Sequence, residues 1–346
     1  MNQSVFFALL AAALFGASTP FAKLLATGVP PILLAGLLYL GSGIGLTLFR
    51  IVRDKGLKRS AMPKAQWPWL LGAIFFGGVL GPIALMLGLM SSSGATASLL
   101  LNLEAVLTAV IAWVAFKENA DHRIVLGMAA IVAGGIVLAW SGNAISVSDW
   151  IGPILVTTAC LCWSIDNNLT RKVSDSDALF IATVKGLIAG IVNTSLALSL
   201  GAQMPSVLTT LATMLVGLLG YGVSLVLFVL ALRGLGTART GGYFSTAPFL
   251  GAAVAMLVFD ESVSGTFWMA AVLMGIGVWL HFTEQHEHVH THEATDHSHS
   301  HVHDAHHQHP HDFEWVGRGS HQHHHAHGVI SHSHEHYPDT DHRHAH

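Results

Sequence analysis

Long apolar segments recur along this chain, and each is long enough to cross a lipid bilayer. About 20 predominantly apolar residues span the hydrocarbon core as an α-helix. Ten segments of roughly this length lie near residues 4–26, 31–52, 68–89, 95–116, 123–141, 150–170, 177–200, 209–232, 238–259 and 265–283. Because backbone polar groups must find partners inside the bilayer, each segment is predicted to be a transmembrane helix.

The composition indicates the same class of protein. Hydrophobic residues make up 52% of the chain and charged residues only 10%, which does not suit the surface of a soluble protein of this size. The longest link between segments, residues 53–67, is too short to fold alone, and no nucleotide-binding loop, nucleophile elbow or zinc protease motif is present. The sequence therefore predicts neither an ATP-driven pump nor an enzyme. The predicted function requires no cofactor, and no nucleic-acid partner is indicated.

One stretch of the chain is repeated in degenerate form. Residues 94–118 and residues 237–261 share six identities over 25 positions, and each copy ends in an acidic residue. Paired halves of this kind are typical of secondary transporters. We therefore expect one five-helix repeat at residues 1–141 and a second at residues 142–283. Further matches support this division: residues 128–134 with 269–275, Gly78 with Gly217, and Gly81 with Gly220.

Lys and Arg are concentrated in alternate loops. They occur after the second, fourth, sixth and eighth segments, whereas the other loops between segments contain none. Since cytoplasmic loops hold the excess of Lys and Arg, both termini are predicted to face the cytoplasm. Five segments per repeat is an odd number, so the second repeat is expected to be inverted. Lys117-Glu118 accordingly becomes Asp260-Glu261, without its cation, on the opposite side.

These features resemble the EamA-type members of the drug/metabolite transporter superfamily. The residues that carry the resemblance are LFGASTPFAK in the first segment and the acidic ends of the fourth and ninth segments, and the resemblance covers residues 1–283. It implies a ten-helix, all-α integral membrane protein of a bacterial-type inner membrane. It also implies a secondary transporter, often an exporter of amino acids or related metabolites, with a central cavity between two inverted halves.

Glu104 departs from the pattern of the matching segment, where Ala247 and Pro248 follow one another. An ionised side chain near the middle of the bilayer costs roughly 2.5 to 3.5 kcal/mol on insertion scales. Glu104 should therefore face a cavity, pair with a cation or be protonated. Such residues mark substrate pathways and proton relays. The other interpretation is a structural hydrogen bond, for example with Asn102.

Three polar residues, at positions 166–168, follow one another near the cytoplasmic end of the sixth segment. Consecutive helical residues point about 100° apart, so they cannot all face one cavity. Asp166 is expected to pair with Arg171 or Lys185, within the pathway or as a structural lock. A Lys185 that faced the cavity would suit a carboxylate or phosphate on the solute. The residues predicted for the pathway are Asn102, Glu104, Asp166, Asn168 and Lys185.

Glycine and proline interrupt several of the segments. They permit bending or close helix contact, and interruptions at matching positions of two halves point to a transport site. We expect both roles, because a moving bundle needs hinges as well as close packing. The residues predicted for hinge or packing roles are Gly16, Pro20, Gly78, Gly81, Pro82, Gly217 and Gly220.

The composition changes abruptly after residue 283. Residues 284–346 hold 23 of the 25 histidines, ten acidic residues and few apolar ones, which predicts a disordered cytoplasmic tail. Imidazoles and carboxylates on a flexible chain can bind Zn²⁺, Ni²⁺, Cu²⁺ or Co²⁺. The tail histidines predicted as metal ligands are His286, His288, His290, His292, His297, His299, His301, His303, His323, His324, His325 and His327.

Together these patterns predict a secondary transporter that exports small organic metabolites by alternating access. Protons are the first candidate for coupling, through Glu104 or Asp166. No His lies well inside a segment, which favours an organic solute over a bare metal ion. The alternatives are a Ni, Co or Zn efflux protein fed by the tail, and a membrane-anchored metal sensor that does not transport. The tail also fits a passive buffer, and the sequence leaves the oligomeric state open.

Overall fold

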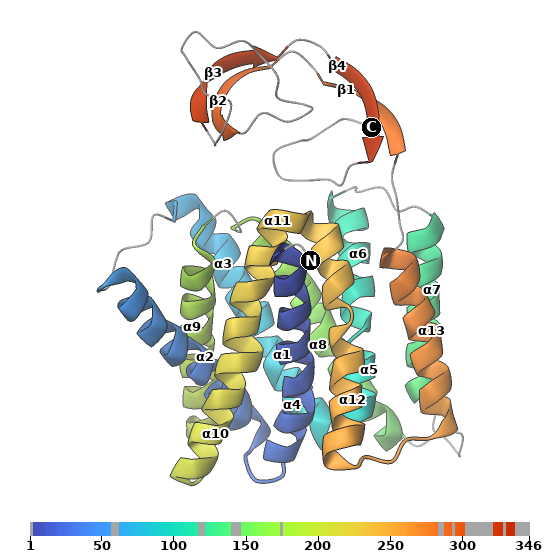
Figure 1. Cartoon of the computed structure of the whole chain (residues 1–346). Helices are drawn as coiled ribbons and strands as arrows, with labels where there is room; N and C mark the ends of the chain where they lie inside the picture. The colour runs from blue at the N-terminus through green and yellow to red at the C-terminus, as the bar shows by residue number, and fades with distance from the viewer. Residues whose placement is uncertain are drawn as a thin grey trace. The chain divides into compact units, whose positions relative to one another are not determined.

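The chain divides into two compact units, Met1–Glu284 and Gln285–His346. The computed structural model describes residues 3–56, 62–116, 122–139, 147–173, 176–282, 287–292, 295–301, 321–327 and 330–335. The described part of the first unit is helical, and Figure 1 shows it as a bundle of roughly parallel and antiparallel rods. The second unit contains short strands and is described separately below.

The first half of the helical unit contains single helices as well as helices built from several pieces. Its elements are α1 (Gln3–Leu25), α2 (Pro31–Asp54), η1 (Lys64–Gln66), α3 (Trp67–Ala73), η2 (Ile74–Leu80), α4 (Gly81–Met90), α5 (Gly94–Leu100), α6 (Leu103–Phe116) and α7 (His122–Ala139). The second half follows the same order. Its elements are α8 (Val147–Arg171), α9 (Ala178–Ser199), α10 (Val207–Gly217), η3 (Leu218–Val223), α11 (Ser224–Phe244), α12 (Ala247–Phe259) and α13 (Gly265–Phe282).

Apolar helices of membrane length confirm the all-α membrane class. Seven helical stretches in the described residues are long and apolar enough to cross a bilayer, and residues 125–139 and 265–280 form shorter apolar helices. α8 is 25 residues long but has a polar second half. The total of ten spans remains a prediction, because α7, α8 and α13 are too short or too polar to be counted on length and composition alone.

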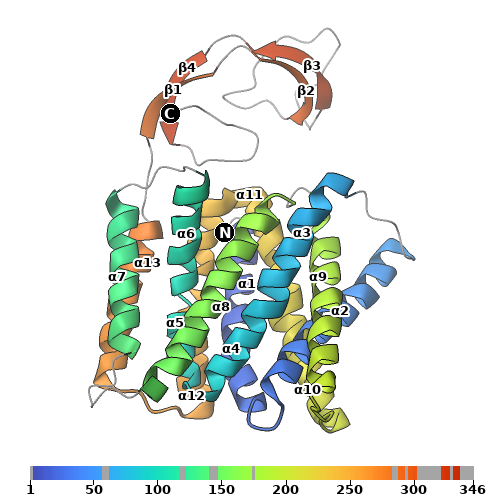
Figure 2. The same cartoon turned by 180° about the vertical axis from the view of Figure 1, so that it is seen from behind.

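The packing of the helices repeats in the two halves. α2 packs on α9, and α7 packs on α13, at opposite ends of the bundle in both views (Figures 1 and 2). α1 packs on η3, α11 and α12, and its counterpart α8 packs on η2, α4 and α6. In the order of the two halves, η2, α4 and α6 correspond to η3, α11 and α12. The contacts of α1 and α8 are therefore equivalent, as an inverted repeat requires. The sequence repeat is therefore also a repeat of tertiary contacts.

The interruptions of the helices also correspond. η2 and η3 are π-helical turns, and η3 begins 144 and ends 143 residues after η2. The break between α5 and α6 and the break between α11 and α12 are 144 residues apart. Interrupted segments at matching positions are thus present. The predicted pairs, Gly78 with Gly217 and Gly81 with Gly220, are only 139 residues apart. Compared with the spacing of the interruptions, this pairing is about one helical turn out of register.

Two predicted helix boundaries are wrong. The segment predicted at residues 95–116 is broken at Leu101 and Asn102, where the Asn102 amide donates a hydrogen bond to the Leu99 carbonyl at 3.0 Å and competes with the helical pattern. The loop predicted between the eighth and ninth segments lies inside α11 instead. α11 ends at Phe244, shortly before Pro248 in the first turn of α12. The helix ends there because proline disfavours a helical conformation in the residue that precedes it.

The glycines predicted for hinge or packing roles lie at close helix contacts. A Cβ atom added to Gly78 would lie 2.7 Å from the Ala189 methyl group on α9. One added to Gly81 would lie 3.0 Å from the indole nitrogen of Trp163 on α8. Small residues permit this approach between membrane helices, whereas a hinge role remains a prediction. The other close contacts join Gly16 to Ala247, Gly217 to Leu38 and Gly220 to Ser18.

Gly217→Ala is expected to destabilise the helical unit by about 1 to 3 kcal/mol, because the added methyl group meets the backbone of Leu38 and overpacks the contact. Gly275 on α13 is the matched control, since nothing described lies within 4 Å of the same position there. Gly275→Ala is expected to be neutral or stabilising by about 0.5 to 1 kcal/mol. Thermal unfolding in detergent measures both, and equal midpoints would contradict the close packing.

The described parts of the tail unit form two antiparallel two-stranded sheets. β1 (Glu287–His292) pairs with β4 (Ile330–Glu335), and β2 (Thr295–His301) pairs with β3 (His321–His327). The prediction of a disordered tail differs from the structure in these segments. The physical reason is alternation: His288, His290 and His292 alternate with the β-branched Val289 and Thr291, a period of two that suits a strand.

Candidate transport site

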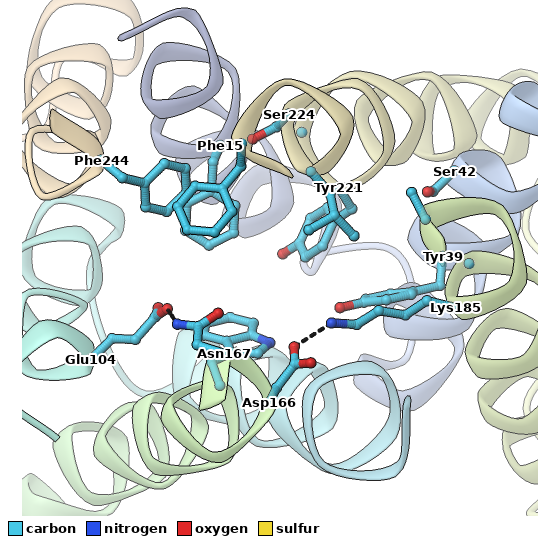
Figure 3. Close-up of a pocket in the computed structure, with 16 residues that line it drawn as sticks. Phe15, Tyr39, Ser42, Glu104, Asp166, Asn167, Lys185, Tyr221, Ser224 and Phe244 are labelled. Atoms are coloured by element: carbon cyan, nitrogen blue, oxygen red, sulfur yellow. Dashed lines mark hydrogen bonds and ion pairs between the residues drawn. The ribbon is translucent and has the colours of Figure 1, made fainter. Parts of the chain in front are cut away.

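A cavity inside the helical unit is lined by residues from both halves. Its volume is about 80 Å³, enough for several water molecules but below the roughly 300 to 1,000 Å³ of typical ligand pockets. A metabolite-sized solute therefore requires the surrounding helices to move apart. The first half contributes Phe15, Tyr39, Ser42 and Glu104, and the second contributes Trp163, Asp166, Asn167, Ala182, Lys185, Gly186, Gly220, Tyr221, Ser224, Leu225, Phe228 and Phe244 (Figure 3).

A buried ion pair forms one side of the cavity. The ammonium group of Lys185 on α9 donates to Oδ2 of Asp166 on α8, and both side chains are buried. The other oxygen, Oδ1, accepts a hydrogen bond from the Thr170 hydroxyl at 2.9 Å. Of the two partners predicted for Asp166, Lys185 is therefore the one observed. The bonding of both carboxylate oxygens offsets part of the cost of burying the charge.

The π-helical turn η2 shapes the wall behind this ion pair. A side chain at Gly77 would collide with the Asp166 carboxylate, so the absence of a Cβ atom makes room for the ion pair. The Gly77 carbonyl accepts from the Tyr39 hydroxyl at 2.7 Å and from the Trp163 indole N–H at 3.0 Å. π-helical turns are frequent at functional sites. Here one carbonyl orients two aromatic residues of the cavity.

Glu104 lies in the cavity as a result of the break between α5 and α6. The break places Glu104 in the first turn of α6, where the positive end of the helix dipole favours a carboxylate. Its Oε1 accepts from the Asn167 amide at 2.7 Å, as drawn in Figure 3. The Ser164 hydroxyl donates to the Glu104 backbone carbonyl at 3.0 Å. The alternative partner considered for Glu104, Asn102, is not the one observed.

Two of the five predicted pathway residues do not line the cavity. Asn102 is buried, and its amide group contacts the Leu99 carbonyl at 3.0 Å and the Met274 sulfur at 3.8 Å. Asn168 is also buried and donates to the Ser164 carbonyl at 2.8 Å within its own helix. The amide nitrogens of both residues are bonded within the protein, whereas Oδ1 of Asn102 has no hydrogen-bond partner among the described residues. Asn167 lines the cavity instead, as the 100° step between neighbours on α8 allows.

Aromatic side chains form the opposite side of the cavity. Phe15 is central: its ring centroid lies 5.8 Å from that of Trp163, 5.9 Å from that of Tyr221 and 5.4 Å from that of Phe244. These separations lie within the preferred range for aromatic pairs. Sequence reasoning did not find these residues, because isolated aromatic residues inside apolar segments carry no signal that separates a cavity from ordinary packing.

The acidic end of the ninth segment connects the two halves away from the cavity. The Glu261 carboxylate accepts from the backbone N–H of Gly94 at 3.0 Å and from that of Ala95 at 2.9 Å. It therefore satisfies two N–H groups that the start of α5 would otherwise leave without partners. The matching residue of the first half, Glu118, lies outside the described residues.

Lys185→Met is expected to destabilise the protein by about 3 to 5 kcal/mol, because it leaves the Asp166 carboxylate buried without its cation. Adding Asp166→Asn should restore part of this loss, since the amide keeps the shape and carries no charge. Thermal unfolding of the two single variants and the double variant in detergent measures the coupling. Strictly additive losses would show that the two side chains do not interact.

The helical unit matches a known family of membrane proteins. The model of the EamA-like transporter family matches residues 2–140 and again residues 150–283, once in each half. These two stretches cover most of the chain, and the chain therefore belongs to the EamA-like transporter family. With the apolar helices described above, this makes it a multi-pass membrane protein with a general transport function.

Similar proteins agree with this family. An uncharacterized transporter of Methanothermobacter thermautotrophicus is 25% identical over 281 residues, which cover 77% of this chain and 82% of the relative. The uncharacterized transporter YyaM of Bacillus subtilis is 25% identical over 158 residues, 44% of this chain and 50% of the relative. A solved crystal structure with 19% identity has a TM-score of 0.61 and covers 80% of this chain and 94% of its own. That likeness concerns the fold alone.

The tail unit places histidines opposite one another across its strands. Residues opposite each other in an antiparallel pair have Cα atoms about 4.5 to 5.5 Å apart. No group of three or more metal-ligating side chains is found among the described residues, and the predicted ligands His286 and His303 lie outside them. The opposed pairs are His288 with His334, His290 with His332, His297 with His325, His299 with His323, and His301 with His321.

Proposed function

We propose that this protein is a secondary transporter that exports small organic solutes by alternating access, with the described cavity as its solute site. The observation that carries the proposal is one cavity, lined by both inverted halves, that contains three charged side chains: Glu104, Asp166 and Lys185. Ionisable residues inside a membrane are costly and mark solute or proton pathways. The resemblance to the family supports export, and the distribution of Lys and Arg supports cytoplasmic termini in an inner membrane.

Alternating access requires the helices around the cavity to change their contacts. The π-helical turns η2 and η3 and the two helix breaks lie in the helices that pack on α8 and α1. Backbone hydrogen bonding is already irregular at such points, so bending there perturbs fewer regular bonds than bending elsewhere. We place the hinges of the transport movement at these four points, in corresponding positions of the two halves.

Glu104 is the proposed site of proton coupling. One of its oxygens accepts from Asn167, and no cation is paired with it among the described residues. Asp166 is less suited to this role, because its two oxygens are bonded to Lys185 and Thr170. A carboxylate that binds a proton in one state and releases it in the other links solute movement to a proton gradient.

The export function is tested by comparing metabolites released from cells with and without this chain. Glu104→Gln keeps the shape of the side chain and removes its charge, so it is expected to reduce export about tenfold or more and to abolish its dependence on the pH gradient. Glu287→Gln, the same change in the tail unit, is the matched control and should export normally. Export by Glu104→Gln that equals the wild type at every pH would rule out coupling at Glu104.

We propose a second, regulatory function for the tail: binding of Zn²⁺, Ni²⁺, Cu²⁺ or Co²⁺ from the cytoplasm. The observation that favours it is the register of opposed histidines across β1/β4 and β2/β3. Imidazole suits all four ions, and a metal bridge would stabilise two-stranded sheets that are marginal alone in water.

Replacing the ten opposed histidines by Asn in the full chain should remove most Ni²⁺ binding, measured by isothermal titration, while solute export persists. Undiminished Ni²⁺ binding would contradict this role of the paired strands. Export of the metal itself, lost in the same variant, would instead favour the metal efflux alternative. Metal binding without export of any solute would favour the sensor alternative.

A further inference from the structure

The charges of the cavity do not balance. The described residues that line it include two carboxylates, Glu104 and Asp166, and one ammonium group, that of Lys185, which gives a net charge of −1 when all three are ionised. The Lys185 ammonium group is bound to Asp166 in a buried ion pair. The excess negative charge therefore belongs to Glu104, whose carboxylate accepts a hydrogen bond from the neutral amide of Asn167 at 2.7 Å. A carboxylate with one neutral donor retains capacity for a cationic donor.

The aromatic rings that line the cavity also favour a positive charge. Tyr39 and Trp163 both donate their polar hydrogens to the Gly77 carbonyl, so their rings, and not their donors, are available to the cavity. Phe15 and Phe244 lie across the cavity from Glu104 in Figure 3. Ring faces attract cations, and the attraction strengthens where water is excluded. One carboxylate opposite several aromatic rings is a suitable environment for an ammonium group on an apolar body.

A solute carboxylate finds no free cation among the described lining residues, and the Tyr221 hydroxyl, which has no hydrogen-bond partner there, offers it only a neutral donor. It would have to take the Lys185 ammonium group from Asp166, and this would leave a buried carboxylate without a cation. The sequence alone suggested that Lys185 would suit a carboxylate or phosphate. The ion pair argues against that role, because the charge of Lys185 is already paired with Asp166 inside the protein.

We propose that the solute of this transporter is a hydrophobic organic cation: a protonated amine with an aromatic or branched apolar body and no carboxylate. This inference rests on the proposed function and gives its solute class. The ammonium group of the solute donates a hydrogen bond to the Glu104 carboxylate, and the apolar body packs against the rings around Phe15. A proton and the amine compete for the same carboxylate, so amine binding weakens as the pH falls.

Three probes built on the same phenylethyl body separate the charge classes: phenethylamine, phenylalanine and 3-phenylpropanoate, which are cationic, zwitterionic and anionic at neutral pH. Binding to the purified full-length protein is measured by thermal stabilisation in detergent over a pH series. Phenethylamine is expected to bind about tenfold or more tightly than the other two probes. Its affinity should fall towards low pH. Phenylalanine or 3-phenylpropanoate binding as tightly as the amine would overturn the proposed class.

Glu104→Gln should weaken phenethylamine binding about tenfold or more and remove its pH dependence. Glu104→Asp keeps the charge and should keep the preference for the cation, which separates loss of charge from a general loss of structure. Glu287→Gln is the control that should bind like the wild type. If phenethylamine binding to Glu104→Gln still depended on pH, the assignment of the cation to this carboxylate would be overturned.

The metabolite comparison distinguishes a wrong solute class from a wrong function. If the exported compound is anionic, zwitterionic or neutral, the transporter proposal stands and the cation proposal fails. If none of the probes binds and no solute is exported in the presence of the chain, both proposals fail. Export of amines that phenethylamine inhibits is the expected result.

Discussion

A lipid bilayer offers no hydrogen bonds to a peptide backbone, and this constraint determines most of the structure. Wherever a helix is interrupted inside the bundle, the carbonyl and amide groups it releases must find partners within the protein. The Gly77 carbonyl is the clearest example, because it accepts from both Tyr39 and Trp163. An irregular backbone is thereby converted into a fixed position for two rings. The irregularity and the cavity beside it are therefore parts of one arrangement.

The same constraint explains why the charged residues lie where they do. Glu104 stands at the start of a half-helix, and Asp166 has a cation and a hydroxyl group as partners. Each charge is buried only where the fold supplies a dipole, a counter-ion or a hydrogen bond. Gly77 contributes by leaving space for the Asp166 carboxylate. The charges of the cavity consequently depend on two backbone features of the first half, the start of α6 and the glycine at position 77.

The sequence predicts the fold well because the signals for it are distributed over whole segments. Two halves of membrane helices were predicted from the length of the apolar segments, the bias of Lys and Arg, and the repeated stretch. The family match supports that prediction. Single boundaries were predicted less well: the break at Leu101 and Asn102 depends on one side-chain hydrogen bond, which apolar length does not indicate. The tail strands were not predicted, because overall composition does not show that histidine alternates with other residues.

The site was only partly predictable for a related reason. Glu104, Asp166 and Lys185 were recognisable because a charge inside an apolar segment is conspicuous, and all three line the cavity. Asn168 and Asn102 were chosen on polarity alone, and the direction in which a side chain points depends on helix phase and on local breaks. The aromatic lining gave no signal, since Phe15 or Tyr221 would serve equally well in ordinary packing.

The inverted repeat has a thermodynamic consequence for a protein that changes conformation. Under the proposed alternating access, equivalent contacts in the two halves would give the two end states, facing opposite sides of the membrane, nearly the same packing energy. The free-energy difference between those states must then arise where the halves differ. Glu104, matched by Ala247, is such a place. In the proposed mechanism, the direction and the driving ion of transport would then depend on a small set of side chains that differ between the halves.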